Sequence, residues 1–132
     1  IIRVKNREDI FSTCDIISVH TPLLDDTRKM INAETIAMMK DGVIFVNTSR
    51  GNNVDEAALL DALNSGKLRY AAVDVACVEP IPADSPLLSA PNCIITPHMA
   101  WAPIESRMRI QDCTERSIQA FLAGKPINTV NM

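Results

Sequence analysis

The sequence lacks the features that mark membrane-spanning and nucleic-acid-binding proteins. No apolar run approaches the roughly 20 residues that a helix needs to cross a bilayer, and no signal peptide is visible in a chain that opens at Ile1. Thirteen basic side chains against sixteen acidic ones give a net charge of -3, which excludes a strongly basic surface for nucleic acid or anionic lipid. Aromatic residues make up only 4% of the 132 residues, but hydrophobic residues reach 47%. That apolar content is enough for one compact domain.

Cysteine is scarce and shows no metal-binding or disulfide pattern. None of the four cysteines forms a C-x-x-C pair, and they lie far apart in the sequence: Cys14, Cys77, Cys93 and Cys113. Scattered cysteines are typical of small buried side chains in a reducing compartment. We therefore expect no metal site, no disulfide framework and a cytoplasmic location.

Short apolar segments predict four β-strands, at residues 15–20, 43–46, 70–75 and 93–96. Helical patterns fall at residues 27–40, from Asp55 to a stop at Gly66, and at 104–122. Asp55 and Glu56 suit the positive N-terminus of the second of these helices. The proline-rich stretch 79–92 is expected to form a stiff surface loop rather than a domain linker.

This alternation of strands and helices indicates an α/β fold with an open, doubly wound, mostly parallel sheet. The predicted strands are nearly continuous apolar runs. Such runs are typical of strands that helices cover on both faces, because those strands lose the in-out alternation of a half-exposed sheet. We therefore expect both faces of the sheet to be buried.

Polar residues follow three of the predicted strands at their carboxyl ends, where ligands bind in parallel sheets. The strand at 43–46 runs into Asn47-Thr48-Ser49-Arg50-Gly51. The strand at 70–75 carries Asp74 and is followed by Glu79, and the strand at 93–96 leads to His98. An arginine, a carboxylate and a histidine are thus expected at one edge of the sheet.

These three residue types together suit the reduction of a 2-keto acid. The planar guanidinium of Arg50 can bind a carboxylate and the neighbouring carbonyl oxygen. His98 can donate the proton that a developing alkoxide requires, and the Glu79 carboxylate can orient the imidazole and favour its charged form.

Each of these residues also has a purely structural interpretation. His98 alone could cap a loop, Glu79 before a proline could be a turn residue, and Arg50 could form a structural ion pair. Their combination at three strand ends favours catalysis over these alternatives. His20 has no comparable neighbours and is expected to be a strand-end residue outside the catalytic set.

Short motifs along the whole chain resemble those of one enzyme family. In order they are Asp15-Ile-Ile-Ser-Val-His-Thr-Pro-Leu23, Met39-Lys-Asp-Gly42, Asn47-Thr-Ser-Arg-Gly51, Val54-Asp-Glu56, Asp74-Val75, Glu79-Pro80 and Thr96-Pro-His98. Together they resemble the D-isomer-specific 2-hydroxyacid dehydrogenases. The run from Thr96 to Trp101 is most similar to the glycerate dehydrogenase (hydroxypyruvate reductase) branch.

The resemblance implies a fold and a place within a larger enzyme. Residues 1–132 would be the C-terminal part of an NAD(P)-binding domain, with the second half of a partial Rossmann-like sheet. Residues 104–132 would include the helix that returns toward the substrate domain. The implied enzyme is an oxidoreductase that transfers a hydride between a nicotinamide cofactor and a small D-2-hydroxy acid or 2-keto acid such as glycerate or hydroxypyruvate.

The resemblance also implies roles for the catalytic residues. Arg50 would bind the carboxylate and keto oxygen of the substrate. His98 would be the acid–base residue, and Glu79 would pair with it. Trp101 would help to form the wall of the substrate pocket, although a tryptophan at this position also suits a subunit contact.

The cofactor contacts implied by the resemblance fall into two groups. Asp74 would contact the nicotinamide carboxamide, together with residues along the nicotinamide side, which are Thr48, Ser49, Arg50 and His98. The adenine end would be flanked by His20, Thr21 and Pro22.

The sequence departs from the family pattern in what it lacks. It contains no G-x-G-x-x-G turn for a pyrophosphate. It also lacks the residue that determines the preference for NAD or NADP, and NAD is the favoured cofactor. We expect the 132 residues alone neither to bind the cofactor tightly nor to turn over. The full-length enzyme would be a homodimer with a small-molecule substrate, and without a nucleic-acid or membrane partner.

Two alternative functions belong to relatives of this family. An NAD-sensing regulatory module, similar to a corepressor, would bind cofactor without turnover, and the joint presence of Arg50, Glu79 and His98 disfavours it. A formate dehydrogenase would lack the glutamate partner of the histidine, and Glu79 argues against it.

Overall fold

The structure, a computed structural model, describes residues 2–130 of the chain. The chain divides into two compact units, Ile1–His98 and Met99–Met132. Within the described residues, no helix is both long enough and apolar enough to cross a membrane.

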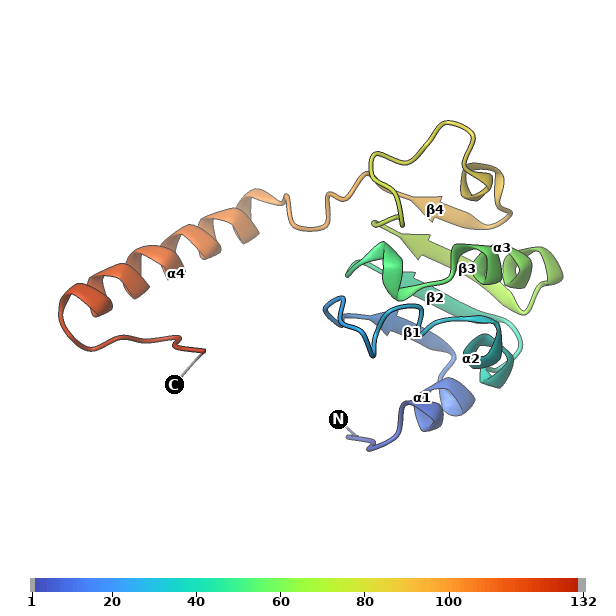
Figure 1. Ribbon diagram of the computed structural model, residues 1–132, viewed down its shortest axis with the longest axis horizontal. Coiled ribbons are helices and arrows are strands. Elements are labelled where there is room, and N and C mark those ends of the chain that lie inside the picture. The colour runs from blue at the N-terminus through green and yellow to red at the C-terminus, as the bar shows by residue number, and fades with distance from the viewer. Residues whose placement is uncertain (1, 131–132) are drawn as a thin grey trace. The chain divides into compact units, whose positions relative to one another are not determined.

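The first unit is built on a four-stranded parallel sheet in the order β1-β2-β3-β4 (Figure 1). Its strands are β1 (Ile16–Val19), β2 (Val43–Asn47), β3 (Leu68–Val73) and β4 (Cys93–Ile95). Each strand pairs in parallel with the next. The predicted α/β class with a parallel sheet is confirmed, and β3 begins and ends two residues earlier than the sequence pattern indicated.

Three α-helices and two short 3-10 helices connect and flank the strands. They are α1 (Arg7–Thr13), α2 (Ala33–Met38), η1 (Gly51–Asn53), α3 (Glu56–Ser65) and η2 (Pro86–Ser89). Helix α1 was not predicted, because only Phe11 of its seven residues is buried and its apolar period is therefore weak. The proline-rich stretch is a surface segment as expected, although η2 gives it one turn of helix.

The core lies on one face of the sheet. Ile17 and Val19 of β1 are buried together with Phe45 of β2 and Leu59 of α3, in one apolar cluster. The opposite face is open within this unit, where Ile94 of β4 is 67% exposed. Within this unit the helices therefore cover one face, whereas the sequence predicted that both faces are buried. Right-handed connections between strands that follow one another in sheet order place their helices on the same face.

Helix α2 is shorter than the predicted helix over 27–40. The Asn32 side chain accepts a hydrogen bond from the Thr35 N–H at 3.0 Å, and the Thr35 hydroxyl accepts one from the Asn32 N–H at 2.9 Å. This capping box starts the helix at Ala33. Ahead of the helix, Ile31 pairs with Val54 in an isolated parallel bridge, so the backbone at Ile31 is extended rather than helical.

Helix α3 matches its prediction closely. The Asp55 carboxylate caps its first turn by accepting from the N–H groups of Ala57 and Ala58, and Gly66 ends it with a left-handed φ of 78°. The start of α3 is therefore fixed directly after η1, next to the polar residues that follow β2.

The second unit consists of α4 (Ile104–Leu122) and the segment after it. The bounds of α4 agree with the predicted helix over 104–122. No residue of α4 is buried, and the chain turns back after Gly124 so that the Asn128 amide donates to the Ser117 hydroxyl at 3.2 Å.

The cysteines are all free of disulfide bonds, and their burial differs from the prediction. Cys14, Cys77 and Cys93 are half-buried and Cys113 is exposed. The expectation of four buried cysteines is therefore wrong, because Cys113 lies on α4, which buries none of its residues.

Candidate active site

The carboxyl ends of β2, β3 and β4 are linked by main-chain hydrogen bonds. The Asp74 N–H donates to the Asn47 carbonyl at 2.9 Å, and the His98 N–H donates to the Asp74 carbonyl at 2.8 Å. The residues that follow the three strands are therefore held side by side, as expected for the ends of adjacent parallel strands.

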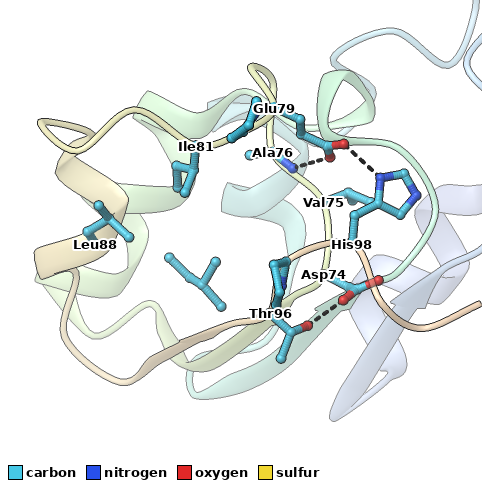
Figure 2. Close-up of a pocket in the computed structure, with 11 residues that line it drawn as sticks. Asp74, Val75, Ala76, Glu79, Ile81, Leu88, Thr96 and His98 are labelled. Atoms are coloured by element: carbon cyan, nitrogen blue, oxygen red, sulfur yellow. Dashed lines mark hydrogen bonds and ion pairs between the residues drawn. The ribbon is translucent and has the colours of Figure 1, made fainter. Parts of the chain in front are cut away.

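His98 and Glu79 are joined by a hydrogen bond at this edge. His98 Nδ1 lies 2.7 Å from Glu79 Oε2, and the Ala76 N–H donates to Glu79 Oε1 at 3.0 Å (Figure 2). The hydrogen bond from His98, followed by the one from Ala76, holds the pKa of the Glu79 carboxyl below its ordinary value of 4.5. Glu79 is thus an ionised acceptor, and His98 carries a proton on Nδ1.

The backbone of His98 has an uncommon conformation. Its φ is 52°, in the left-handed region that residues with a Cβ seldom adopt. The His98 N–H, which donates to the carbonyls of both Asp74 and Thr96, holds this conformation in place. Local backbone strain of this kind is concentrated at functional sites in proteins.

Asp74 lies directly after β3 and is buried, with 4% of its surface exposed. The Thr96 hydroxyl donates to Asp74 Oδ1, which partly compensates for the desolvation of the carboxylate. The sequence had indicated Asp74 as a strand residue, and the structure places it one residue beyond the strand end.

A cavity of about 590 Å³ adjoins these groups. Asp74, Glu79 and His98 supply its polar wall, and Ile81 and Ile95 contribute to its apolar wall. Figure 2 shows Asp74 and His98 on one side of this space and Ile81 and Leu88 on the other. A polar wall facing an apolar one is typical of small-molecule sites.

The turn after β2 is organised by Asn47, which is buried. Its side-chain oxygen accepts from the Ser49 N–H at 3.0 Å and from the Ser49 hydroxyl at 2.8 Å, and its amide donates to the Arg50 carbonyl at 3.0 Å. The Arg50 side chain is exposed, and its Nη1 donates to the Ser49 carbonyl at 2.7 Å. Thr48 is also exposed.

Thr21 is tied to this turn through Asn53. The Asn53 amide, which is completely buried, donates to the Thr21 carbonyl at 2.9 Å, to the Thr21 hydroxyl at 3.1 Å and to the Ser49 hydroxyl at 3.2 Å. The structure therefore joins two of the predicted cofactor contacts, Thr21 and Ser49. His20 and Pro22 are exposed beside them, and His20 Nε2 lies 2.8 Å from the Ser18 hydroxyl.

The predicted site residues thus fall into four sets, of which His20, Thr21 and Pro22 after β1 form the first. Asp74, Glu79 and His98 line one cavity, whereas Arg50, Thr48 and Ser49 lie on the neighbouring turn after β2. Trp101 belongs to the second unit, where its side chain is 59% exposed. Its assignment to a pocket wall stays a prediction, as do the roles of the other residues.

Several polar residues that shape this region had no structural role predicted from the sequence. Asn47 and Asn53 are buried asparagines, and Thr96 is half-buried. Glu56 was assigned only to the positive N-terminus of a helix, but its carboxylate accepts from the Cys77 N–H at 2.6 Å. An asparagine next to apolar residues in the sequence could have indicated these positions, because a buried amide requires hydrogen-bond partners.

Among residues 2–130, no group of three or more histidine, cysteine, aspartate or glutamate side chains is placed to hold a metal ion. Cys77 is also poorly suited to react as a nucleophile. Burial, with the charge of Glu56 beside it, raises the pKa of its thiol to about 11.

Comparison with known proteins identifies the family of the first unit. Residues 1–100 match the family described as D-isomer specific 2-hydroxyacid dehydrogenase, NAD binding domain. A hydroxypyruvate reductase from Blautia hydrogenotrophica is 51% identical over 124 residues, which cover 94% of this chain and 38% of that protein. A glycerate dehydrogenase from Methylorubrum extorquens is 45% identical over 126 residues, covering 93% of this chain and 40% of that protein.

A solved structure agrees with these relatives. The D-isomer specific 2-hydroxyacid dehydrogenase from Xanthobacter autotrophicus, in complex with NADPH and MES, is 39% identical and superposes with a TM-score of 0.80, over 94% of this chain and 51% of that one. The present chain spans about two fifths of the length of the two curated relatives. The chain therefore belongs to the D-isomer specific 2-hydroxyacid dehydrogenase family, as part of the NAD-binding domain.

Proposed function

We propose that these residues are part of an NAD- or NADP-dependent oxidoreductase that interconverts a small 2-keto acid and the corresponding D-2-hydroxy acid, such as hydroxypyruvate and glycerate. The observation that carries the proposal is the His98–Glu79 pair, held at 2.7 Å at the carboxyl end of β4. Its relatives named hydroxypyruvate reductase and glycerate dehydrogenase support this choice of substrate class.

His98 supplies and removes the proton in the proposed reaction. Because Nδ1 faces Glu79, Nε2 is the nitrogen that donates a proton to the carbonyl oxygen as it becomes an alkoxide, and it accepts that proton in the reverse direction. Ionised Glu79 stabilises the doubly protonated imidazolium and fixes the direction of the ring. The alkoxide is thereby converted to the hydroxyl of the product.

Arg50 provides the proposed contact for the substrate carboxylate. A guanidinium can donate two parallel hydrogen bonds to a carboxylate. The Arg50 side chain is exposed and donates to the carbonyl of the neighbouring Ser49, so rotation about its side-chain bonds can direct it to a ligand. Trp101 is proposed to form part of the wall of the substrate pocket.

The residues present fit a nicotinamide cofactor. Buried Asp74 is a carboxylate at the rim of the cavity, and a carboxylate can accept the N–H of the nicotinamide carboxamide in addition to the Thr96 hydroxyl. Thr48 and Ser49 are proposed to lie along the nicotinamide side, and His20, Thr21 and Pro22 at the adenine end. When bound, the cofactor supplies or accepts the hydride.

The place of this chain within a longer enzyme is part of the same proposal. Residues 1–132 are the C-terminal part of the cofactor domain of a longer, homodimeric enzyme, and the segment 104–132 includes the helix that returns toward the substrate domain. A cytoplasmic location is part of the same proposal.

Replacement of His98 tests the assignment in the full-length enzyme. His98→Ala is expected to lower kcat for hydroxypyruvate or glyoxylate reduction by roughly 100-fold or more, the usual contribution of a general acid. Glu34→Ala is the control, because Glu34 is an exposed residue of α2 with no proposed role in the site, and it should retain near wild-type turnover. Near wild-type turnover of His98→Ala would refute the assignment. Cofactor binding by the wild type without turnover on a panel of 2-keto acids would favour a regulatory module instead.

A further inference from the structure

The Cys77 peptide group is held from both sides by the segment that follows Arg50. Its N–H donates to Glu56 Oε1 at 2.6 Å, and its carbonyl accepts from the Asn52 amide at 3.4 Å. The hydrogen bond to Glu56 is the shorter of these two contacts.

Gly51 brings the two segments into direct backbone contact. Gly51 is buried, and a Cβ added to it would overlap the carbonyl group of Ala76 and the nitrogen of Cys77. The backbone of η1 thus lies against the Ala76–Cys77 peptide with no space for a side chain. The loop after β3 and the turn after β2 are therefore packed directly against each other, backbone to backbone.

The same loop orients the catalytic pair. The Ala76 N–H donates to Glu79 Oε1 at 3.0 Å, while Glu79 Oε2 meets His98 (Figure 2). Any displacement of the Ala76–Cys77 peptide would therefore change the direction of the Glu79 carboxylate. The contacts run without interruption from Glu56 through Cys77 and Ala76 to Glu79.

We infer that Glu56 is a positioning residue of this site: its carboxylate, assisted by Asn52, fixes the loop 76–79 so that Glu79 meets His98. The catalytic consequence rests on the proposed function, whereas the structural coupling does not. Glu56 also provides a link between the Arg50 turn and the His98–Glu79 pair, because it follows Arg50 by six residues and contacts the loop that carries Glu79.

Substitutions of Glu56 distinguish the effect of side-chain length from that of negative charge. Glu56→Ala removes the acceptor, and Glu56→Asp keeps the charge on a side chain one methylene shorter. Glu56→Gln keeps both the length and an acceptor oxygen. Glu34→Ala is the matched control, because Glu34 is also an acidic residue in the first turn of a helix, α2, and is exposed.

Amide hydrogen exchange and carboxyl-carbon NMR on the 132-residue chain measure the coupling without requiring activity. Glu56→Ala and Glu56→Asp should accelerate exchange at both the Cys77 and Ala76 amides, on the order of tenfold. They should also return the pKa of Glu79 toward its ordinary value. Glu56→Gln and Glu34→Ala should leave both quantities near those of the wild type, and amides of β2 should exchange as before in all variants.

Two outcomes would overturn the inference. In the first, the Cys77 amide exchanges faster while the Ala76 amide and the Glu79 pKa stay unchanged, which would make Glu56 only a local contact. In the second, all amides including those of β2 accelerate equally, even in Glu56→Gln, which would make Glu56 a general stability residue.

Kinetics of the full-length enzyme then test the catalytic consequence. Glu56→Ala and Glu56→Asp are expected to lower kcat and kcat/KM for the keto acid together by roughly tenfold, with the KM for the cofactor unchanged and with activity restored in Glu56→Gln. If the wild type reduces no 2-keto acid, the proposed function fails while the exchange result stands. If the wild type is active and Glu56→Ala retains full kcat, positioning by Glu56 is refuted.

Discussion

At the residue scale, Glu79 is the group whose ionisation most directly affects the site. Its folded-state pKa is lowered by His98 and by the Ala76 N–H. A carboxyl whose pKa is lowered on folding stabilises the fold at pH values above its unfolded pKa, and this contribution is lost as the pH falls through the folded pKa. The pairing with His98 thus remains available down to a lower pH than an ordinary glutamate would allow.

This linkage predicts a pH-dependent effect of Glu79→Gln. The loss of unfolding free energy relative to the wild type should be present at about pH 6 and should shrink as the pH falls below the ordinary pKa of 4.5 and through the lowered folded-state pKa of Glu79. Urea unfolding at a series of pH values measures this difference. In a His98→Ala background the effect of Glu79→Gln should be smaller, and equal effects in both backgrounds would show that the pair is not coupled.

Residue-level roles were only partly predictable from the sequence. Arg50, Glu79 and His98 were found because their side-chain chemistry is distinctive and because each follows a strand. Asn53 was not found, because its importance lies in three hydrogen bonds to groups that are distant in the sequence. Among the described residues, the Asn53 Oδ1 is buried without a hydrogen-bond partner. The hydrogen bonds that its amide nitrogen donates therefore orient the side chain.

At the scale of elements, helix-capping residues were the sequence feature that best predicted where helices begin and end. Asp55 and Gly66 marked both ends of α3, whereas the helix over 27–40 was predicted too long because Asn32 was not recognised as its cap. Burial on a single face was also missed. The strand sequences are apolar on both sides, and sequence alone does not show which side its own helices cover.

The short element η1 has a specific requirement at Gly51. Gly51→Ala is expected to cost about 3 kcal/mol or more of unfolding free energy, the upper end of the range for overpacking, because the new methyl group would meet backbone atoms rather than a movable side chain. Gly42→Ala is the comparison, because Gly42 has open space around it and a φ of 79°. It should cost only about 1–2 kcal/mol, from backbone strain.

Denaturant unfolding of the two alanine variants decides this point. A larger loss for Gly51→Ala is expected, together with a Glu79 pKa closer to its ordinary value. A smaller loss at Gly51 than at Gly42 would show that η1 can move away from the loop after β3.

At the scale of the whole molecule, the 132 residues carry the proposed proton donor but not a phosphate-binding turn. The sequence contains no G-x-G-x-x-G motif, and backbone N–H groups of such a turn at a helix N-terminus supply much of the affinity for a dinucleotide. We expect calorimetry to detect NAD binding at least about 100-fold weaker for the 132-residue chain than for the full-length enzyme. We also expect no turnover by the isolated chain.

Titration of both proteins with NAD and with NADP under the same conditions provides the measurement. Equal affinity of the isolated chain and the full-length enzyme would mean that the cofactor is held mainly by the residues described above. Either outcome leaves the His98–Glu79 geometry unaffected.

The ends of the strands are joined through the main chain, from Asn47 to Asp74 and from Asp74 to His98. Substitutions of side chains elsewhere around the cavity, such as Ile81 and Leu88, therefore leave this backbone framework in place. In the proposed enzyme, a change in the lining of the site can therefore alter which keto acid binds, while the proposed proton donor keeps its position.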